Sequence, residues 1–67
     1  MEEEKILTER EIEVLSLLYK GYSNKLIAEK LFVTIHTVKF HLENIYRKLE
    51  THNRIQTIIK AIEMKIL

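Results

Sequence analysis

Residues 34–50 read TIHTVKFHLENIYRKLE and contain neither glycine nor proline. Thr34 is a favourable N-cap, so the segment predicts a helix over residues 35–50. When the helix is wound at about 100° per residue, one side carries a regular apolar stripe. The stripe is spaced i, i+4, i+7 and i+11 and consists of Val38, Leu42, Ile45 and Leu49. One face of this helix is therefore expected to pack into a core.

The opposite side of the same helix has a different composition. It carries His36, Phe40, Glu43 and Arg47, with Lys39 at its edge. An exposed phenylalanine among cations and hydrogen-bond acceptors is uncommon on a face that only contacts water. These residue types also read base edges and hold phosphates. The pattern indicates a helix that packs with one face and contacts DNA with the other.

Length and composition restrict the class of protein. The chain has 67 residues, of which 46% are hydrophobic and 31% are charged. This is typical of one globular domain near the lower size limit for an unaided core. The absence of cysteine excludes disulfides and thiolate metal sites. The apolar runs are too short for a membrane span or a signal peptide.

Charge is distributed unevenly, although the formal net charge is only +1. Residues 1–13 contain six glutamates and two basic residues, a balance of −4. Residues 20–48 contain six lysines or arginines and two glutamates, a balance of +4. The asymmetry favours a basic contact surface in the middle of the chain. A mixed surface that only contacts water is the alternative.

Capping residues mark the other expected helices. Thr8-x-x-Glu11 is a capping box for a helix over about 9–20, which Gly21 ends. Ser23 is a good N-cap for a short helix over about 24–31. The expected inward-facing residues of these two helices are Ile12, Leu15, Leu18 and Tyr19, flanked by Val14 and Leu17, and then Ile27, Ala28 and Leu31.

The last expected helix covers about 54–64, after a capping box of Asn53 and Gln56. Its core-facing residues are expected to be Ile58 and Ala61, with Ile62 at the edge. A second apolar row consists of Ile55, Ile59, Ile62 and Ile66. A helix edge this apolar favours a partner, so homodimerisation through this helix is one hypothesis. A larger core than expected is the other.

Several motifs occur together at fixed spacings. They are Leu7-Thr8-x-Arg10-Glu11, Gly21-Tyr22-Ser23-Asn24-Lys25, Ile27-Ala28-x-x-Leu31, Thr37-Val38-Lys39-x-His41, Asn44-Ile45, Lys48-Leu49 and Arg54. Over roughly residues 6–62 the chain thus resembles the LuxR-type, or GerE-like, DNA-binding domain of bacterial transcription regulators. The resemblance implies a single all-α, four-helix domain over 1–67. A helix-turn-helix is expected at 23–50 and a dimerisation helix at 54–64, and the acidic residues 1–5 are expected to form a flexible lead-in.

The same resemblance implies sequence-specific binding of double-stranded DNA as a homodimer on an inverted repeat. Its positions for base or groove contacts fall on Lys39, Phe40 and Glu43. Free backbone N–H groups at the start of the second helix also favour a phosphate. The expected DNA-binding residues are Ser23, Asn24, Lys25, Thr37, Lys39, Phe40, Glu43 and Arg47, and the expected dimer residues are Ile55, Ile59 and Ile62.

The chain departs from the family pattern at four positions. Leu26 replaces a common glutamate, which removes a capping box and exposes a leucine. Many relatives place a polar or basic residue at Glu43, so the sequence preference of this chain is open. Thr57 replaces a common alanine. Thr51 stands where an apolar residue is common, so we expect a looser corner between the last two helices.

The resemblance also sets expectations about partners. The family usually forms the C-terminal output domain of response regulators or autoinducer receptors, and free-standing versions exist. RNA polymerase is a second candidate partner, and the expected location is the nucleoid in the bacterial cytoplasm. We expect no membrane contact, cofactor, metal or small-molecule ligand in this domain. His36 and His52 lack a partner at metal-ligand spacing, and His41 is expected to be a packed or hydrogen-bonded structural residue.

Two other functions compete with DNA binding. In the first, the chain is a helical protein-interaction module that uses Phe40 and the exposed apolar face of the last helix. In the second it is an enzyme, but the sequence contains no grouping typical of catalysis and leaves little room for a pocket. We therefore expect no enzymatic activity.

Overall fold

The computed structural model describes residues 6–67, and this part of the chain folds into four helices without a strand. The helices are α1 (Glu9–Tyr19), α2 (Asn24–Leu31), α3 (Ile35–Leu49) and α4 (Arg54–Glu63). The all-α prediction is confirmed, and each expected boundary lies within one residue of the observed one. The lead-in expected at 1–5 lies outside the described residues. No helix in the described part has the length and apolar content needed to cross a bilayer.

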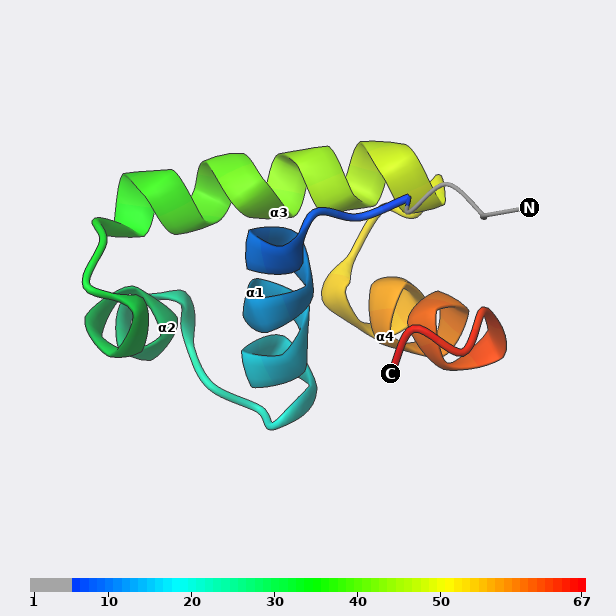
Figure 1. Cartoon of the computed structure of the whole chain (residues 1–67), viewed down its shortest axis with the longest axis horizontal. Coiled ribbons are helices and arrows are strands. Elements are labelled where there is room, and N and C mark those ends of the chain that lie inside the picture. The colour runs from blue at the N-terminus through cyan, green and yellow to red at the C-terminus, as the bar shows by residue number, and fades with distance from the viewer. Residues whose placement is uncertain (1–5) are drawn as a thin grey trace.

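The arrangement of the helices leaves one side of α3 uncovered. α1, α2 and α4 each pack against α3 and lie on the same side of it (Figure 1). The expected stripe of α3 is buried, with Val38 and Ile45 fully inaccessible to solvent. The core residues from all parts of the domain are Leu7, Val14, Leu15, Leu18, Ile27, Ala28, Val38, Leu42, Ile45, Leu49 and Ala61.

Side-chain caps begin all four helices, as the sequence predicted. In the capping box of α1, the N–H of Glu11 donates to Thr8 Oγ1 at 3.1 Å and the N–H of Thr8 donates to Glu11 Oε1 at 3.0 Å. The other three N-caps are Ser23, Thr34 and Asn53. The second capping box is incomplete, because the side chain of Gln56 accepts from the N–H of His52 and not from Asn53.

Residues with a left-handed backbone conformation follow α1, α2 and α3. Gly21 has φ +90° and follows α1, as expected for a C′ glycine. Phe32 and Glu50 follow α2 and α3 with φ of 59° and 57° and are not glycine. Such a conformation costs roughly 1–2 kcal/mol for an L-residue. It also lets the N–H of Val33 donate back to the carbonyl of Ala28 at 3.0 Å, which closes the turn between α2 and α3.

The buried stripe of α1 is rotated from the predicted one. Tyr19, expected in the core, is 57% exposed, whereas Val14, expected at the edge, is fully buried. The stripe is centred on Val14, Leu15 and Leu18 and includes the carboxyl-bearing Glu11. The prediction for Tyr19 was wrong because the buried face includes positions 11 and 14, which leaves Ile12 half-buried at its edge and turns Tyr19 outward.

The C-terminal part of α4 also differs from prediction. Ile66, expected in the exposed row, packs against the core instead. Lys65 takes a left-handed φ of 62°, and the N–H of Ile66 donates to the carbonyl of Ala61 at 2.9 Å. The chain therefore turns back over α4, and the exposed row is limited to Ile55, Ile59 and Ile62.

The corner between α3 and α4 is closed by a pair of buried hydroxyls. Thr51 Oγ1 lies 2.6 Å from Thr57 Oγ1, and Thr57 Oγ1 donates to the carbonyl of Asn53 at 2.7 Å. Since Thr57 uses its proton on Asn53, Thr51 must be the donor of the pair. The looser corner expected from Thr51 is not found, because the two departures from the family pattern bond to each other.

A largely buried ion pair connects the start of α1 to the end of α3. Lys48 Nζ lies 2.8 Å from Glu11 Oε1, and Glu11 is only 4% exposed. Burial raises the pKa of Glu11, but the hydrogen bonds from Lys48 and from Thr8 together lower it by a larger amount. The pKa of Glu11 is therefore below its ordinary value. The ionised carboxylate is thus the stable form in the folded domain at neutral pH.

Replacing Glu11 with Gln should lower the free energy of unfolding by about 1–3 kcal/mol at neutral pH, because Lys48 loses its anionic partner. Because the pKa of Glu11 is lower in the folded domain than in the unfolded chain, the ionised carboxylate stabilises the fold at pH values above about 4.3, the ordinary pKa of glutamate. This stabilisation is lost as the pH falls through the pKa of Glu11 in the folded domain. The difference between Glu11→Gln and the parent should therefore narrow at acid pH. Urea unfolding at several pH values measures it.

Glu13→Gln is the matched control. Glu13 forms an exposed pair with Arg10 at 3.3 Å, and exposed pairs contribute little to stability. Equal losses for the two variants, or a Glu11→Gln loss that does not change with pH, would contradict the assignment.

Replacing Thr57 with Val should lower the free energy of unfolding by about 1–3 kcal/mol, because it leaves the buried hydroxyl of Thr51 without its partner. The double variant Thr51→Val/Thr57→Val removes both hydroxyls and should recover part of that loss. Thermal unfolding by circular dichroism measures both. Additive losses would show that the two hydroxyls do not depend on each other.

Candidate nucleic-acid interface

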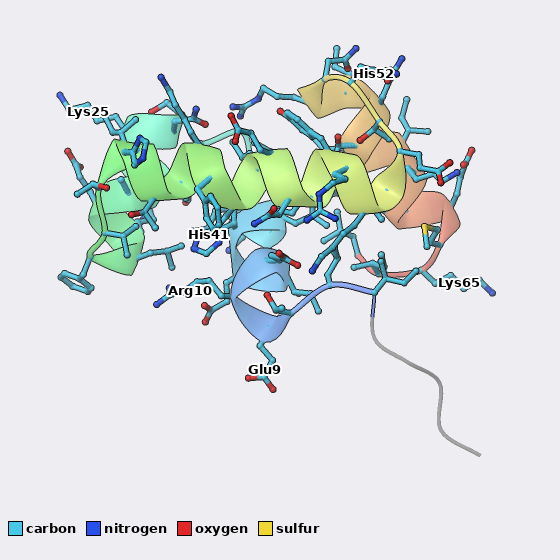
Figure 2. The ribbon with its side chains drawn as sticks, turned by 90° about the horizontal axis from the view of Figure 1, so that it is seen from above. Glu9, Arg10, Lys25, His41, His52 and Lys65 are labelled. Carbon is cyan, nitrogen blue, oxygen red and sulfur yellow. The ribbon has the colours of Figure 1, made fainter. Side chains whose placement is uncertain are left out.

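The uncovered side of α3 presents the polar and aromatic residues that the sequence placed there. His36, Lys39, Glu43 and Arg47 are exposed, and Phe40 is 56% exposed. Arg47 Nη2 donates to Asn44 Oδ1 at 2.9 Å, which holds the guanidinium along the helix surface. Its remaining N–H groups can donate outward. Figure 2 looks onto this side of α3.

The start of α2 lies beside the N-terminal end of α3. Ser23 Oγ accepts from the N–H of Leu26 at 3.1 Å, so its oxygen caps the helix. Lys25 is exposed and projects outward from α2 (Figure 2). This end of α2 therefore combines a lysine ammonium with the unsatisfied N–H groups and positive dipole of a helix N-terminus, which attract anions.

The start of α3 carries a hydroxyl pair. The hydroxyl of Thr34 donates to Thr37 Oγ1 at 3.0 Å and accepts from the N–H of Thr37 at 3.0 Å. Since Thr37 accepts from Thr34, its own proton can be donated to another acceptor. Thr37 is half-buried, on the flank of α3 and not at the centre of the outer face.

The exposed apolar row of α4 forms a separate surface. Ile55, Ile59 and Ile62 are 71%, 51% and 49% exposed and follow an i, i+4, i+7 spacing. Ile62, which the sequence placed both at the edge of the core and in the second apolar row, belongs to the row. α2 and α4 do not pack against each other in the described part of the chain.

Comparison with known proteins identifies the family. Residues 5–61 match the family described as bacterial regulatory proteins, luxR family. The chain belongs to this family. The response regulator VraR of Staphylococcus aureus is 48% identical over 62 residues, which cover 92% of this chain and 30% of VraR. VraR of Staphylococcus epidermidis matches to the same extent.

Solved structures of this family share the fold. The response regulator ChrA, from a haem-sensing two-component system, superposes with a TM-score of 0.91 at 41% identity. That alignment covers 98% of this chain and 33% of ChrA. The transcription factor GerE superposes with a TM-score of 0.89 at 34% identity, over 96% of both chains. The present chain therefore spans about a third of the two response regulators and nearly all of GerE.

Lys48 does not add a free positive charge to the uncovered face of α3 in this LuxR-family domain. The sequence analysis counted it in the basic middle segment, but its ammonium is paired with Glu11. Lys30 is also engaged, since its Nζ lies 5.1 Å from the centre of the Tyr22 ring. The positive surface is therefore smaller than the charge count of residues 20–48 suggested.

His41 is a packed residue on the flank of α3, as expected. It is half-buried and lies on the side of α3 that faces α1 (Figure 2). Its ring centre is 5.9 Å from that of Phe40, at an interplanar angle of 58°. Tilted aromatic pairs of this separation are favourable, so His41 restrains the ring that the uncovered face presents.

Sequence reasoning missed the role of Arg54 in this LuxR-family domain. Arg54 Nη2 donates to the carbonyl of Tyr22 at 2.9 Å, and Nη1 donates to Asn24 Oδ1 at 3.4 Å. Arg54 was matched only as a family position, because its partners lie 30 and 32 residues away in the chain. The signals in the sequence that pointed to it were its match to the family pattern and its place next to the N-cap of the last helix.

Proposed function

We propose that this domain binds double-stranded DNA sequence-specifically as part of a bacterial transcription regulator, with α3 in the major groove. The observation that carries the proposal is the uncovered side of α3, where cations, an acceptor and a phenylalanine gather. An α-helix with its side chains is about 10–12 Å across, close to the major-groove width of about 12 Å. With the other three helices on the opposite side of α3, nothing in the described part of the chain obstructs that approach.

The chemistry of the outer face suggests which residues discriminate between bases. The ammonium of Lys39 can donate to guanine O6 and N7, and the ring of Phe40 can pack against a thymine methyl. The carboxylate of Glu43 can accept from cytosine N4. These three contacts would supply sequence preference, because each group addresses an atom that differs between base pairs.

Phosphate contacts would supply most of the affinity. Lys25 and the N–H groups at the start of α2 fit one phosphate, and Asn24 can donate its amide beside them. Arg47 and the hydroxyl of Thr37 are placed for others along α3. A binding mode of this kind depends strongly on salt, because each phosphate contact releases a counterion.

Self-association through α4 completes the proposal. The exposed row of Ile55, Ile59 and Ile62 is a surface that a second copy of this chain could bury. Two copies related by a two-fold axis would place their α3 helices in successive major grooves of an inverted repeat, about 34–36 Å apart.

The exposed isoleucines also support a competing function, a protein-interaction module that uses this row and Phe40. Selection of bound sequences from a random DNA pool, followed by titration of the winning duplex at two salt concentrations, separates the two. A two-fold symmetric site whose affinity falls steeply with salt supports DNA binding. No enrichment and no salt-sensitive DNA binding would reject it.

Lys39→Ala should weaken binding to the selected duplex by about 1–3 kcal/mol and relax the preference at one base pair. Lys20→Ala is the control, because it removes the same charge as Lys39→Ala. Lys20 is the C-cap of α1, at the end of that helix that points away from α3 (Figure 1). Fluorescence anisotropy with both variants measures the difference. Equal effects of the two substitutions would show that Lys39 acts only through net charge.

Ile59→Glu should weaken self-association at least about tenfold, since each copy loses a buried isoleucine worth roughly 1.5–3 kcal/mol. Phe32→Glu makes the same kind of change at the turn between α2 and α3, far from α4 (Figure 1), and should leave self-association unchanged. Analytical ultracentrifugation with and without DNA compares the variants. Parent-like association of Ile59→Glu would exclude α4 as the interface.

A further inference from the structure

Arg54 joins two helices that otherwise do not touch. The packed helix pairs in the described part of the chain are α1–α2, α1–α3, α1–α4, α2–α3 and α3–α4. The pair α2–α4 is missing from this set. Arg54 is the first residue of α4, and its half-buried side chain reaches the segment that leads into α2.

The chemistry of guanidinium determines what this link does to its partners. Arginine has five N–H donors and no acceptor, so it can hydrogen-bond to the oxygen of a side-chain amide but not to its NH₂ group. Because Arg54 occupies Asn24 Oδ1, the NH₂ group of Asn24 stays available as a donor. The second bond holds the carbonyl of Tyr22, just before the N-cap Ser23. Arg54 thus restrains both sides of the N-cap that precedes Lys25.

Other restraints on this segment come from its own half of the domain. The N–H of Tyr22 donates to the carbonyl of Leu17 at 3.2 Å, and Lys30 Nζ lies over the Tyr22 ring. These contacts attach the segment to α1 and α2. Within residues 6–67, only Arg54 hydrogen-bonds the segment from the far side of the domain.

We propose that Arg54 is a positioning residue for DNA binding: it holds the start of α2 in the orientation in which Lys25 and Asn24 contact a phosphate. Arg54 acts through Tyr22 and Asn24 and does not itself touch the DNA. This inference rests on the proposed function. It adds that α4, besides carrying the self-association surface, fixes the phosphate-contacting end of the helix-turn-helix.

A double-mutant cycle between Arg54 and Lys25 tests the inference, with the duplex recovered by selection as the probe. In the parent, Lys25→Ala should weaken binding about tenfold, as expected for a hydrogen bond to a charged group. In an Arg54→Ala background the same change should cost less than about threefold, because Lys25 is no longer held at the phosphate. The slope of log affinity against log salt concentration should be shallower for the Arg54→Ala variant, by the amount expected for the loss of about one phosphate contact.

Three controls separate positioning from charge and from stability. Arg54→Lys keeps the charge but cannot hold two acceptors with a rigid fork, so it should restore only part of the coupling to Lys25. Thr57→Val destabilises α4 without touching α2 and should leave the cost of Lys25→Ala unchanged. Arg47→Ala, on the outer face of α3, should cost the same with and without Arg54.

The outcomes distinguish failure of the inference from failure of the proposed function. If the parent shows no salt-sensitive binding to DNA, the proposed function is wrong and the inference falls with it. If the parent binds DNA but Lys25→Ala costs the same in both backgrounds, only the inference is overturned, and Arg54 then contributes independently. Lack of any effect of Lys25→Ala in the parent would also overturn it.

Discussion

Burial of one stripe of α3 is the interaction on which the rest of the domain depends. α3 is packed against each of the other three helices, and its four stripe residues lie at the centre of the core. An exposed side of the same helix is needed for contact with any large ligand. Both conditions are met only if all other helices lie on one side, as they do here (Figure 1). The open face of the domain thus follows from the packing of the other three helices on one side of α3.

Polar links supplement this small core at three places. The pairs Glu11–Lys48 and Thr51–Thr57 connect α1 to α3 and α3 to α4, and Arg54 connects α4 to the start of α2. Within residues 6–67 no buried side-chain nitrogen or oxygen lacks a hydrogen-bond partner. Because an unsatisfied buried polar group costs about 1–3 kcal/mol, complete pairing lets a 67-residue chain bury polar groups without losing its fold.

The sequence predicted what depends on local spacing and missed what depends on distant partners. The caps, the helix boundaries and the two faces of α3 follow from residues within about one turn of each other, so periodicity and capping rules sufficed. The inward turn of Glu11 and the engagement of Lys48 depend on each other across 37 positions. No local sequence pattern marks such a pair, so Glu11 was not expected to be buried and Lys48 was counted among the free surface charges. The DNA-binding and dimer assignments came from the exposed faces of the last two helices and from the family resemblance, and they remain proposals.

The burial of Leu7 determines how this domain would be joined to anything ahead of it. Leu7 is 3% exposed, and the segment before α1 runs to the C-terminal end of α3 (Figure 1). The described residues before α1 therefore lie at the end of α3 that is far from α2 and from the turn into α3 (Figure 1). Burial of Leu7 thus anchors the start of the described chain at the opposite end of α3 from the start of α2, where the phosphate contact is proposed.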